Sequence, residues 1–332
     1  MGRFLMPIYG KVKSNIFNPW GILLGMNSVI SKIFGDKDKR KISIVLCTDA
    51  GYLLPSLVAI ESIYMHKASE TSLDIHILLD GMISEKEWSY IEIMKNRYKG
   101  ITIHPVSHKY EEAPITLAHT TKSTFLRLML PSFFPDIDKC IYLDGDLIVN
   151  SDLYSLYNVN MNRSYVAGVR AATYYKDISK TRKRLGIPKN IRNFEYINAG
   201  ILLLDLKRMR KDGMEEKFNA LVDRPFEMQD QDIINKVCSG RIKIIDLKYN
   251  AVVKYGLLNP SLYEEMPHYQ VAYKRKEYLN ACDNPAIIHF AGKKKPWLYP
   301  EEDYRRLWWE TAKRLPFYED IRTEYNYAST EA

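Results

Sequence analysis

Cysteine is scarce in this chain, and the four cysteines present are far apart in the sequence. Neighbouring cysteines are at least 44 residues apart, which excludes a CxxC metal motif and the dense spacing of a disulfide framework. We therefore expect buried, reduced thiols in a cytoplasmic protein. Internal repeats and low-complexity tracts are also missing. With 46% hydrophobic and 27% charged residues, the composition is that of a globular protein.

A long apolar run is missing as well. The most apolar stretch, WGILLGMNSVISKIF from position 20, is shorter than the roughly 20 residues of a membrane span and is interrupted by polar side chains. Leu23, Met26, Ile30 and Ile33 recur at helical spacing between basic flanks, so residues 1–40 predict a basic extension with an amphipathic helix at a membrane interface. Two alternatives stay open: a packed or unstructured extension, and a signal segment, although no cleavage site follows.

Acidic residues are outnumbered by basic ones, and the formal net charge is +8 with a pI near 9.0. The excess lies towards the ends, because residues 1–40 carry +5 and residues 274–314 carry +4. A basic balance indicates an anionic partner, which is a nucleic acid, a membrane surface or a phosphorylated substrate. We expect no nucleic-acid partner, because basic and aromatic residues form no stripe along the centre of the chain and no nucleic-acid motif occurs.

Short apolar runs alternate with helical patterns from residue 42 onward. Strands are predicted at 42–48, 73–79, 101–106, 139–143, 165–170, 201–206, 242–247 and 286–290, and helices at 53–65, 85–98, 211–223 and 231–238. This alternation indicates an α/β fold with a mainly parallel sheet and flanking helices. Beyond Pro296, basic and aromatic residues at helical spacing predict a C-terminal helical segment. We divide the chain into the extension 1–40, a main domain 41–300 and a helical tail 301–332.

Acidic or histidine side chains follow or end three of the predicted strands, where the ligands of open parallel sheets bind. They are Asp49, the pair Asp144 and Asp146 after CIYL, and His289 in AIIHFAG. Asp144 and Asp146 are two residues apart, so in an extended backbone both carboxylates project from one side, and Gly145 leaves room for a ligand. Two such carboxylates suit Mg²⁺ or Mn²⁺ that completes its shell with phosphate oxygens.

Two other interpretations of this Asp pair compete with a metal site. The first is a solvated turn whose aspartates cap a helix. The second is a phosphatase that forms an aspartyl-phosphate on the first Asp. The phosphatase interpretation is disfavoured because Ile148 stands where those enzymes carry Thr or Val, and because no GDxxxD pair follows.

Six motifs, taken together and in this order, resemble family 8 glycosyltransferases, the retaining GT-A enzymes that include bacterial lipooligosaccharide galactosyl- and glucosyltransferases and glycogenin. The motifs are VLCTDAGY (45–52), STFLRLMLP (123–131), CIYLDGDLIV (140–149), YINAGILLLDL (196–206), MQDQDIIN (228–235) and HFAGKKKPW (289–297). The resemblance covers residues 42–300 and implies a GT-A (Rossmann-like) catalytic domain. It also implies transfer of galactose or glucose from a UDP-sugar to a cell-surface glycan, glycolipid or glycoprotein, such as lipopolysaccharide or capsule.

The resemblance further implies roles for individual residues. Those that match the binding site for the nucleotide, diphosphate and metal are Cys47, Thr48, Asp49, Arg127, Asp144, Gly145, Asp146, His289, Gly292 and Lys295. Those that match the sugar side, around the reacting carbon, are Asn198, Ala199, Asp230 and Gln231. The implied metal ligands are Asp144, Asp146 and His289. A nitrogen ligand favours Mn²⁺ as the cofactor, with Mg²⁺ as the alternative.

The mechanism stays open at this point. Gln231 is a poor nucleophile, which favours attack by the acceptor on the face that UDP leaves, but Asp230 or Asp232 as a transient nucleophile is the alternative. DQDIIN also fits a helix start with Asp230 as the N-cap and Asp232 facing the helix dipole. His289 in an apolar strand and the lysines after it fit a core histidine and a solvated run, although GKKKPW favours the site.

The chain departs from the family at two places. Ala50-Gly51 stand where bacterial galactosyltransferases often carry an Asn at the second position, so the ribose contact there stays open. Ala171 stands where those enzymes place a sugar-contacting Asp, so the choice of hexose also stays open. A non-catalytic nucleotide-sugar or glycan-binding protein is the alternative function, which the presence of all three metal-ligand residues disfavours. We expect the protein in the cytoplasm, in peripheral contact with the inner face of the cytoplasmic membrane.

Overall fold

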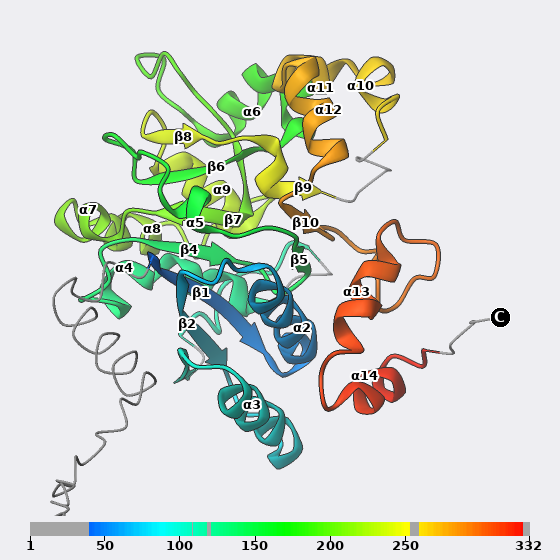
Figure 1. Ribbon diagram of the computed structural model, residues 1–332. Coiled ribbons are helices and arrows are strands. Elements are labelled where there is room, and N and C mark those ends of the chain that lie inside the picture. Colours follow the sequence, from blue (N-terminus) through cyan, green and yellow to red (C-terminus); the bar gives the residue numbers. More distant parts are fainter. Residues whose placement is uncertain (1–39, 108, 118–120, 253–258, 328–332) are drawn as a thin grey trace, which may run out of the picture. The chain divides into compact units, whose positions relative to one another are not determined.

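The computed structural model describes residues 40–107, 109–117, 121–252 and 259–327 (Figure 1). The helix predicted within residues 1–40 thus lies outside the described residues. The central sheet has seven strands in the order β3-β2-β1-β4-β7-β6-β8. These strands are β1 (Arg40–Asp49), β2 (Thr71–Asp80), β3 (Ile101–Val106), β4 (Cys140–Leu143), β6 (Val166–Arg170), β7 (Ile197–Leu204) and β8 (Ile242–Ile244).

The sheet is mixed and mainly parallel, as predicted. The pairs β1–β2, β2–β3, β1–β4 and β6–β8 are parallel, whereas β7 runs antiparallel to both β4 and β6. The direction of β7 matters for function, because it brings the beginning of β7 to the edge at which β1 and β4 end. Leu143 at the end of β4 pairs with Ile201, so residues 198–200 lie beside the Asp144–Asp146 segment.

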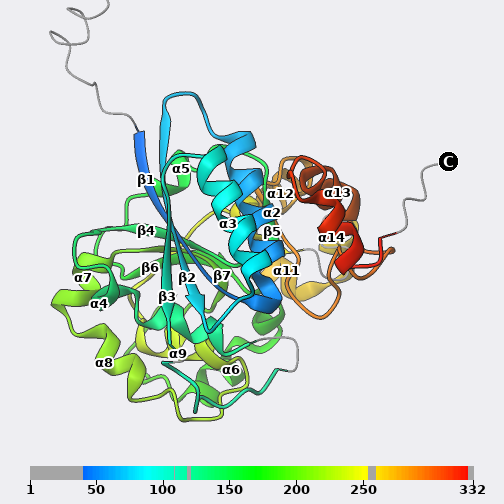
Figure 2. The same ribbon diagram turned by 90° about the horizontal axis from the view of Figure 1, so that it is seen from below.

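Helices cover both faces of the sheet (Figure 2). The side chains of β1 alternate between two cores, since Ile44 and Leu46 belong to one and Val45 and Cys47 to the other. The first face carries α2 (Ala50–His66) and α3 (Glu85–Arg97). The second carries the 3₁₀ helix η1 (Lys122–Leu128), α4 (Leu130–Phe133), α7 (Leu206–Lys211), α8 (Met214–Asn219) and α9 (Gln229–Val237).

A second, three-stranded sheet supplies one side of the site. Its order is β5-β10-β9, with β5 (Leu147–Val149), β9 (Ala251–Val252) and β10 (Ile287–His289). Because β10 runs antiparallel to β5, His289 pairs with Leu147 and comes next to the Asp144–Asp146 segment. The connecting helices are α5 (Tyr154–Tyr157), η2 (Ala172–Asp177), α6 (Ile178–Leu185), η3 (Leu247–Asn250), α10 (Leu262–Glu265), α11 (Pro267–Ala272) and α12 (Arg275–Asp283).

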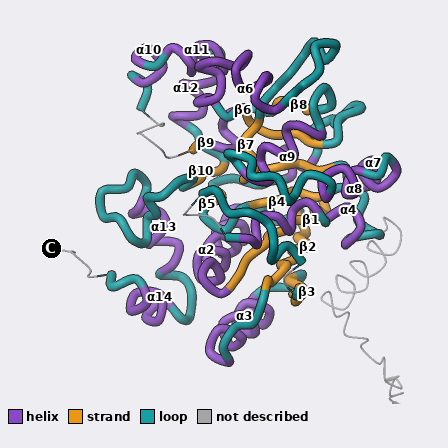
Figure 3. Tube along the Cα trace, turned by 180° about the vertical axis from the view of Figure 1, so that it is seen from behind, coloured by secondary structure: helices purple, strands orange, loops and turns teal. Residues whose placement is uncertain are grey.

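The basic, aromatic C-terminal segment forms α13 (Arg305–Ala312) and α14 (Tyr318–Glu324), as predicted, on the same side as α2 (Figure 3). Trp308 and Trp309 are fully buried in the core of the first face, and α13 packs against α2. None of the helices in the described ranges is long and apolar enough to cross a bilayer.

Some predicted boundaries were wrong, each for a local reason. The helix expected at 211–223 is shorter, because α7 ends at Lys211 and α8 spans only Met214–Asn219, and Gly213 between them adopts a left-handed φ of 58°. The strand expected at 201–206 begins four residues earlier, at Ile197, because Asn198, Ala199 and Gly200 interrupt the apolar pattern there. The strand expected at 242–247 ends at Ile244, and β5 was not predicted because it is only three residues long.

Candidate active site

A cavity of about 330 Å³ opens at the edge where β1 and β4 end and β7 begins. Of the residues assigned to a site from the sequence, all but Asp49 line it. Eight of its polar side chains fall into two groups. One group, here called the charged wall, comprises Arg127, Asp144, Asp146, His289 and Lys295. The other, here called the amide wall, comprises Asn198, Gln231 and Asn250.

The charged wall gathers three side chains with the chemistry of metal ligands. One ligand atom from each of Asp144, Asp146 and His289 lies within 4.8 Å of the others. Nε2 of His289 is 3.3 Å from Oδ1 of Asp146 and 3.7 Å from Oδ2 of Asp144. Gly200 packs tightly against this group, because a Cβ at position 200 would lie 2.2 Å from Cε1 of His289. These residues fit a divalent cation held by two carboxylates and one imidazole nitrogen.

Hydrogen bonds orient His289 for such a role. The backbone N–H of Gly200 donates to Oδ1 of Asn198 (2.9 Å), which also accepts from Nδ2 of Asn250 (2.8 Å). Asn250 therefore presents Oδ1 to Nδ1 of His289 at 2.9 Å, so Nδ1 carries the proton and donates. The lone pair of Nε2 is then directed at the two aspartates, as metal ligation requires. The core-histidine interpretation describes the burial of His289 but not this orientation.

Lys295 is buried beside Asp146, although the sequence places it in a run of three lysines. Its Nζ forms an ion pair with Oδ2 of Asp146 and donates to the carbonyl of Phe290 (3.0 Å). Burial alone would raise the pKa of Asp146, but the ammonium of Lys295 beside it opposes burial and lowers that pKa below its usual range. Lys293 and Lys294 are exposed, as a solvated run predicts. Gly292 lines the cavity with φ 114°, a backbone conformation that favours glycine.

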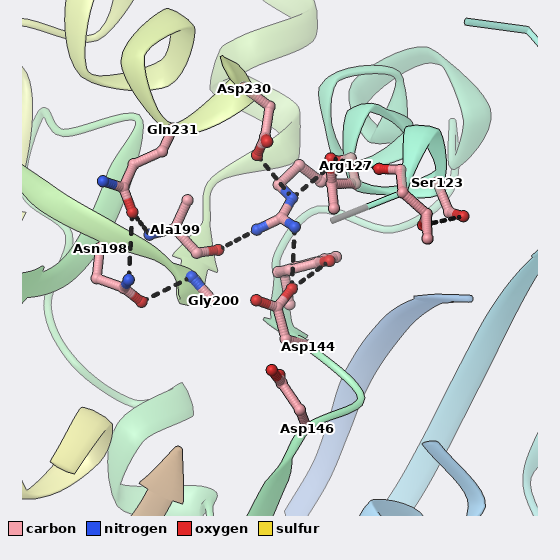
Figure 4. A network of polar contacts seen from close by, with 12 residues as sticks. Ser123, Arg127, Asp144, Asp146, Asn198, Ala199, Gly200, Asp230 and Gln231 are labelled. Carbon is pink, nitrogen blue, oxygen red and sulfur yellow. Dashed lines mark hydrogen bonds and ion pairs between the residues drawn. The ribbon is translucent and has the colours of Figure 1, made fainter. Parts of the chain in front are cut away.

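Arg127 joins the metal-ligand group to the sugar-side residues (Figure 4). Nη2 donates to Oδ1 of Asp144 (2.9 Å), Nη1 donates to the carbonyl of Ala199 (2.5 Å), and Nε is 3.0 Å from Oδ2 of Asp230. Burial raises the pKa of Asp230 to about 6 in spite of Arg127, and the negative charge of Asp144 adds to the increase. The two carboxylates thus flank one guanidinium that is itself 5% exposed.

The amide wall holds Gln231 at both ends of its side-chain amide. Oε1 accepts from the backbone N–H of Ala199 (3.1 Å) and from Nδ2 of Asn198 (3.2 Å), and Nε2 donates to the hydroxyl of Tyr196 (3.0 Å). Asp230 is not an N-cap, because α9 begins at Gln229 with Met228 as its N-cap. The expectation that Asp230 caps the helix was therefore wrong, because Asp230 lies inside α9 as its second residue.

The end of β1 contributes two residues to the cavity. Cys47 and Thr48 line it, and burial raises the pKa of the Cys47 thiol, so that thiol stays protonated. Asp49 does not line the cavity. Its carboxylate caps α2 by accepting from the N–H of Tyr52 (3.1 Å), and it accepts from the hydroxyl of Ser123 (2.6 Å).

Several contributors were not predicted from the sequence. Asn250, Tyr196 and Gly200 each contact a predicted site residue. The motif YINAG contains two of them, Tyr196 and Gly200, so their place beside Asn198 was the signal that could have identified them. Asn250 has no such signal, because it belongs to none of the six motifs. Gly145, which was predicted, packs so closely on α2 that a Cβ would lie 2.3 Å from Oγ of Ser56.

Comparison with known proteins agrees with this geometry. The chain matches the family described as Glycosyl transferase family 8 over residues 43–301. It is 26% identical over 266 residues to general stress protein A of Bacillus subtilis, covering 76% of this chain and 86% of that protein. It is 22% identical over 279 residues to lipopolysaccharide 1,3-galactosyltransferase of Salmonella typhimurium, covering 80% and 77% of the two chains.

Among solved structures, the chain is similar to the galactosyltransferase LgtC in complex with donor and acceptor sugar analogs. The TM-score is 0.66 at 21% identity, covering 87% of this chain and 98% of that one. This likeness shows a GT-A fold, as the resemblance implied. With the family match over more than three quarters of its length, the chain belongs to glycosyltransferase family 8.

Proposed function

We propose that this protein is a retaining hexosyltransferase that moves galactose or glucose from a UDP-sugar to a cell-surface glycan acceptor. The observation that carries the proposal is the division of one cavity into a charged wall and an amide wall. A sugar nucleotide has the same division, with a diphosphate at one end and a neutral hexose at the other. The relatives named as lipopolysaccharide transferases support this class of substrate.

The charged wall suits the departing diphosphate. Among its residues and the adjacent Asp230, three carboxylates face two cations, Arg127 and Lys295, which leaves a demand for positive charge that a divalent metal meets. Asp144, Asp146 and His289 would hold Mn²⁺ or Mg²⁺, which would supply Lewis-acid stabilisation of the diphosphate. Lys295 adds an ammonium that needs no proton transfer to offset the charge on the leaving group.

The amide wall suits the reacting sugar. The bond between C1 and the phosphate oxygen breaks, the acceptor hydroxyl oxygen bonds to C1, and its proton passes to the leaving phosphate. Retention follows when the acceptor attacks the face from which UDP leaves. Gln231 contributes a carbonyl dipole towards the positive charge that develops at C1. The alternative nucleophiles are poorly placed, because Asp232 does not line the cavity and Asp230 is paired with Arg127.

A donor screen tests the proposal. The full chain is incubated with individual UDP-hexoses and with Mn²⁺, Mg²⁺ or chelator, and UDP release is measured. We expect release from at least one UDP-hexose, dependent on the cation, and an α-linked product from an α-linked donor by NMR. Absence of release from every UDP-hexose, or release that chelator leaves unchanged, would contradict the proposal.

We also propose that the basic extension 1–40 attaches the enzyme to the cytoplasmic membrane, with 41–300 as the catalytic domain and 301–332 as a helical tail. The amphipathic pattern of residues 20–34 and the +5 charge support this arrangement. A variant without residues 1–34 should lose binding to anionic liposomes and keep UDP release. Unchanged liposome binding would overturn the role of the extension.

A further inference from the structure

Gln231 is anchored by a chain of polar side chains that leads away from the cavity. Nε2 of Gln231 donates to the hydroxyl of Tyr196, and that hydroxyl donates to Oδ1 of Asp232 at 2.6 Å. Asp232 in turn pairs with Arg184, whose Nη2 is 2.9 Å from Oδ1 and whose Nη1 contacts Oδ2. This series of polar contacts therefore leads from the amide wall through the core to Arg184 on α6 at the surface.

The direction of each hydrogen bond is determined by Asp232. Its two oxygens accept from four donors: the two terminal nitrogens of Arg184, the hydroxyl of Tyr196, and the backbone N–H of Met228 at 3.0 Å. A carboxylate paired in this way only accepts, so the hydroxyl of Tyr196 must donate to it and accept from Gln231. Burial, and then the charge of Asp232, raise the pKa of Tyr196 well above its usual value, which keeps this donor proton in place.

The same contacts leave Asp232 with no role at the reacting carbon. Its side chain is fully buried, it does not line the cavity, and all its bonding positions in the site are taken by protein donors. A buried carboxylate with this set of partners orients other groups.

We propose that Tyr196, Asp232 and Arg184 are positioning residues that hold the amide of Gln231 with its carbonyl oxygen directed to the reacting sugar. The inference rests on the proposed function. A flipped amide would direct N–H groups at a carbon that gains positive charge, which is repulsive. Because the hydroxyl of Tyr196 offers an acceptor to Nε2, and the N–H of Ala199 offers a donor to Oε1, only one orientation satisfies both ends.

A double-mutant cycle tests the coupling. Tyr196→Phe removes the hydroxyl and keeps the ring, and we expect kcat for UDP release to fall about 10- to 100-fold with a smaller change in KM, since misplacement costs rate more than binding. In a Gln231→Ala background the same substitution should change kcat less than about 2-fold. Equal losses in both backgrounds would overturn the proposal. Tyr165→Phe is the matched control, because Tyr165 also donates to an aspartate, Asp212 at 2.7 Å, away from the cavity.

Two further measurements separate this inference from a structural role and from failure of the proposed function. Arg184→Lys keeps the charge but not the two-pronged contact, so it should lower kcat less than Arg184→Gln; equal loss would overturn the role of Arg184. The ¹⁵N signal of the Gln231 side-chain amide, assigned by its loss in Gln231→Ala, should move in Tyr196→Phe and stay in Tyr165→Phe. This readout needs no substrate: an unmoved signal contradicts the positioning role, whereas a wild type that releases no UDP contradicts only the proposed function.

Discussion

The two walls of the cavity are built by different means. The charged wall is assembled from strand ends, loops and the 3₁₀ helix η1, with residues up to 168 positions apart, from Arg127 to Lys295, and ion pairs hold most of it together. In the amide wall, the backbone N–H groups of Ala199 and Gly200 set the direction of the amides of Gln231 and Asn198. Under the proposed function, the first wall would supply charge to the leaving group, whereas the second would orient a neutral sugar.

Asp146→Asn should have the largest effect, because it removes a metal-ligand oxygen from the charged wall. We expect UDP release to fall about 1000-fold, equivalent to about 4 kcal/mol of activation free energy, with a retained circular dichroism spectrum. Exposed Asp138, which pairs with Lys207, provides the matched control as Asp138→Asn. Turnover of Asp146→Asn within about 10-fold of wild type would show that the charged wall does not depend on this carboxylate.

Asp230 lies between the two walls, and its raised pKa predicts a pH-dependent stability. With a pKa near 6 in the folded state against 3.8, the folded chain binds the proton more tightly. The free energy of unfolding therefore falls as pH rises, by about 2 kcal/mol between pH 4 and 6 out of about 3 kcal/mol over the whole titration of this group. Urea unfolding at both pH values should show a smaller fall in Asp230→Asn than in wild type, and an unchanged fall in the exposed control Asp223→Asn. Equal falls in wild type and Asp230→Asn would contradict the assignment.

Lys295→Met should lower kcat for UDP release about 100-fold, or about 2.7 kcal/mol, because an ammonium that faces the leaving group is lost. Lys294→Met is the neighbouring control, since Lys294 is exposed and pairs only with Glu301 among the described residues. The expected difference between two adjacent lysines sharpens the comparison, because only one belongs to the charged wall. Similar values of kcat for Lys295→Met and Lys294→Met would show that Lys295 does not stabilise the leaving group.

Asn250→Ala should have the smallest effect, because Asn250 acts on the charged wall only by orienting His289. We expect the concentration of Mn²⁺ for half-maximal UDP release to rise about 10-fold, with kcat at saturating metal less affected. Asn280→Ala, on α12 and away from the cavity, is the control. An unchanged metal dependence in Asn250→Ala would show that the two walls act independently.

Much of the site could be predicted from the sequence because its residues lie in short motifs at strand ends. The Asp144–Asp146 pair, His289 and Gln231 were all found in this way, and the structure places them around one cavity. Asp49 shows the limit of this approach. Its position after β1 predicts a ligand contact, which stays a prediction, and its carboxylate also caps α2 and accepts from the hydroxyl of Ser123. Because Asp49 both ends β1 and precedes α2, its side chain could bind a ligand or cap the helix, and the local sequence pattern does not distinguish these two roles.

The sequence by itself determined the α/β class through its periodicity and the family through the resemblance of six short motifs, which also contain the candidate site residues. Only the tertiary structure decided how those side chains are oriented. The antiparallel direction of β7 brings Asn198 beside Asp144, and the pairing of β10 with β5 brings His289 beside Asp146. The lone pair of His289 and the carbonyl of Gln231 are then directed by hydrogen bonds between residues 33 to 52 positions apart, which no local pattern encodes.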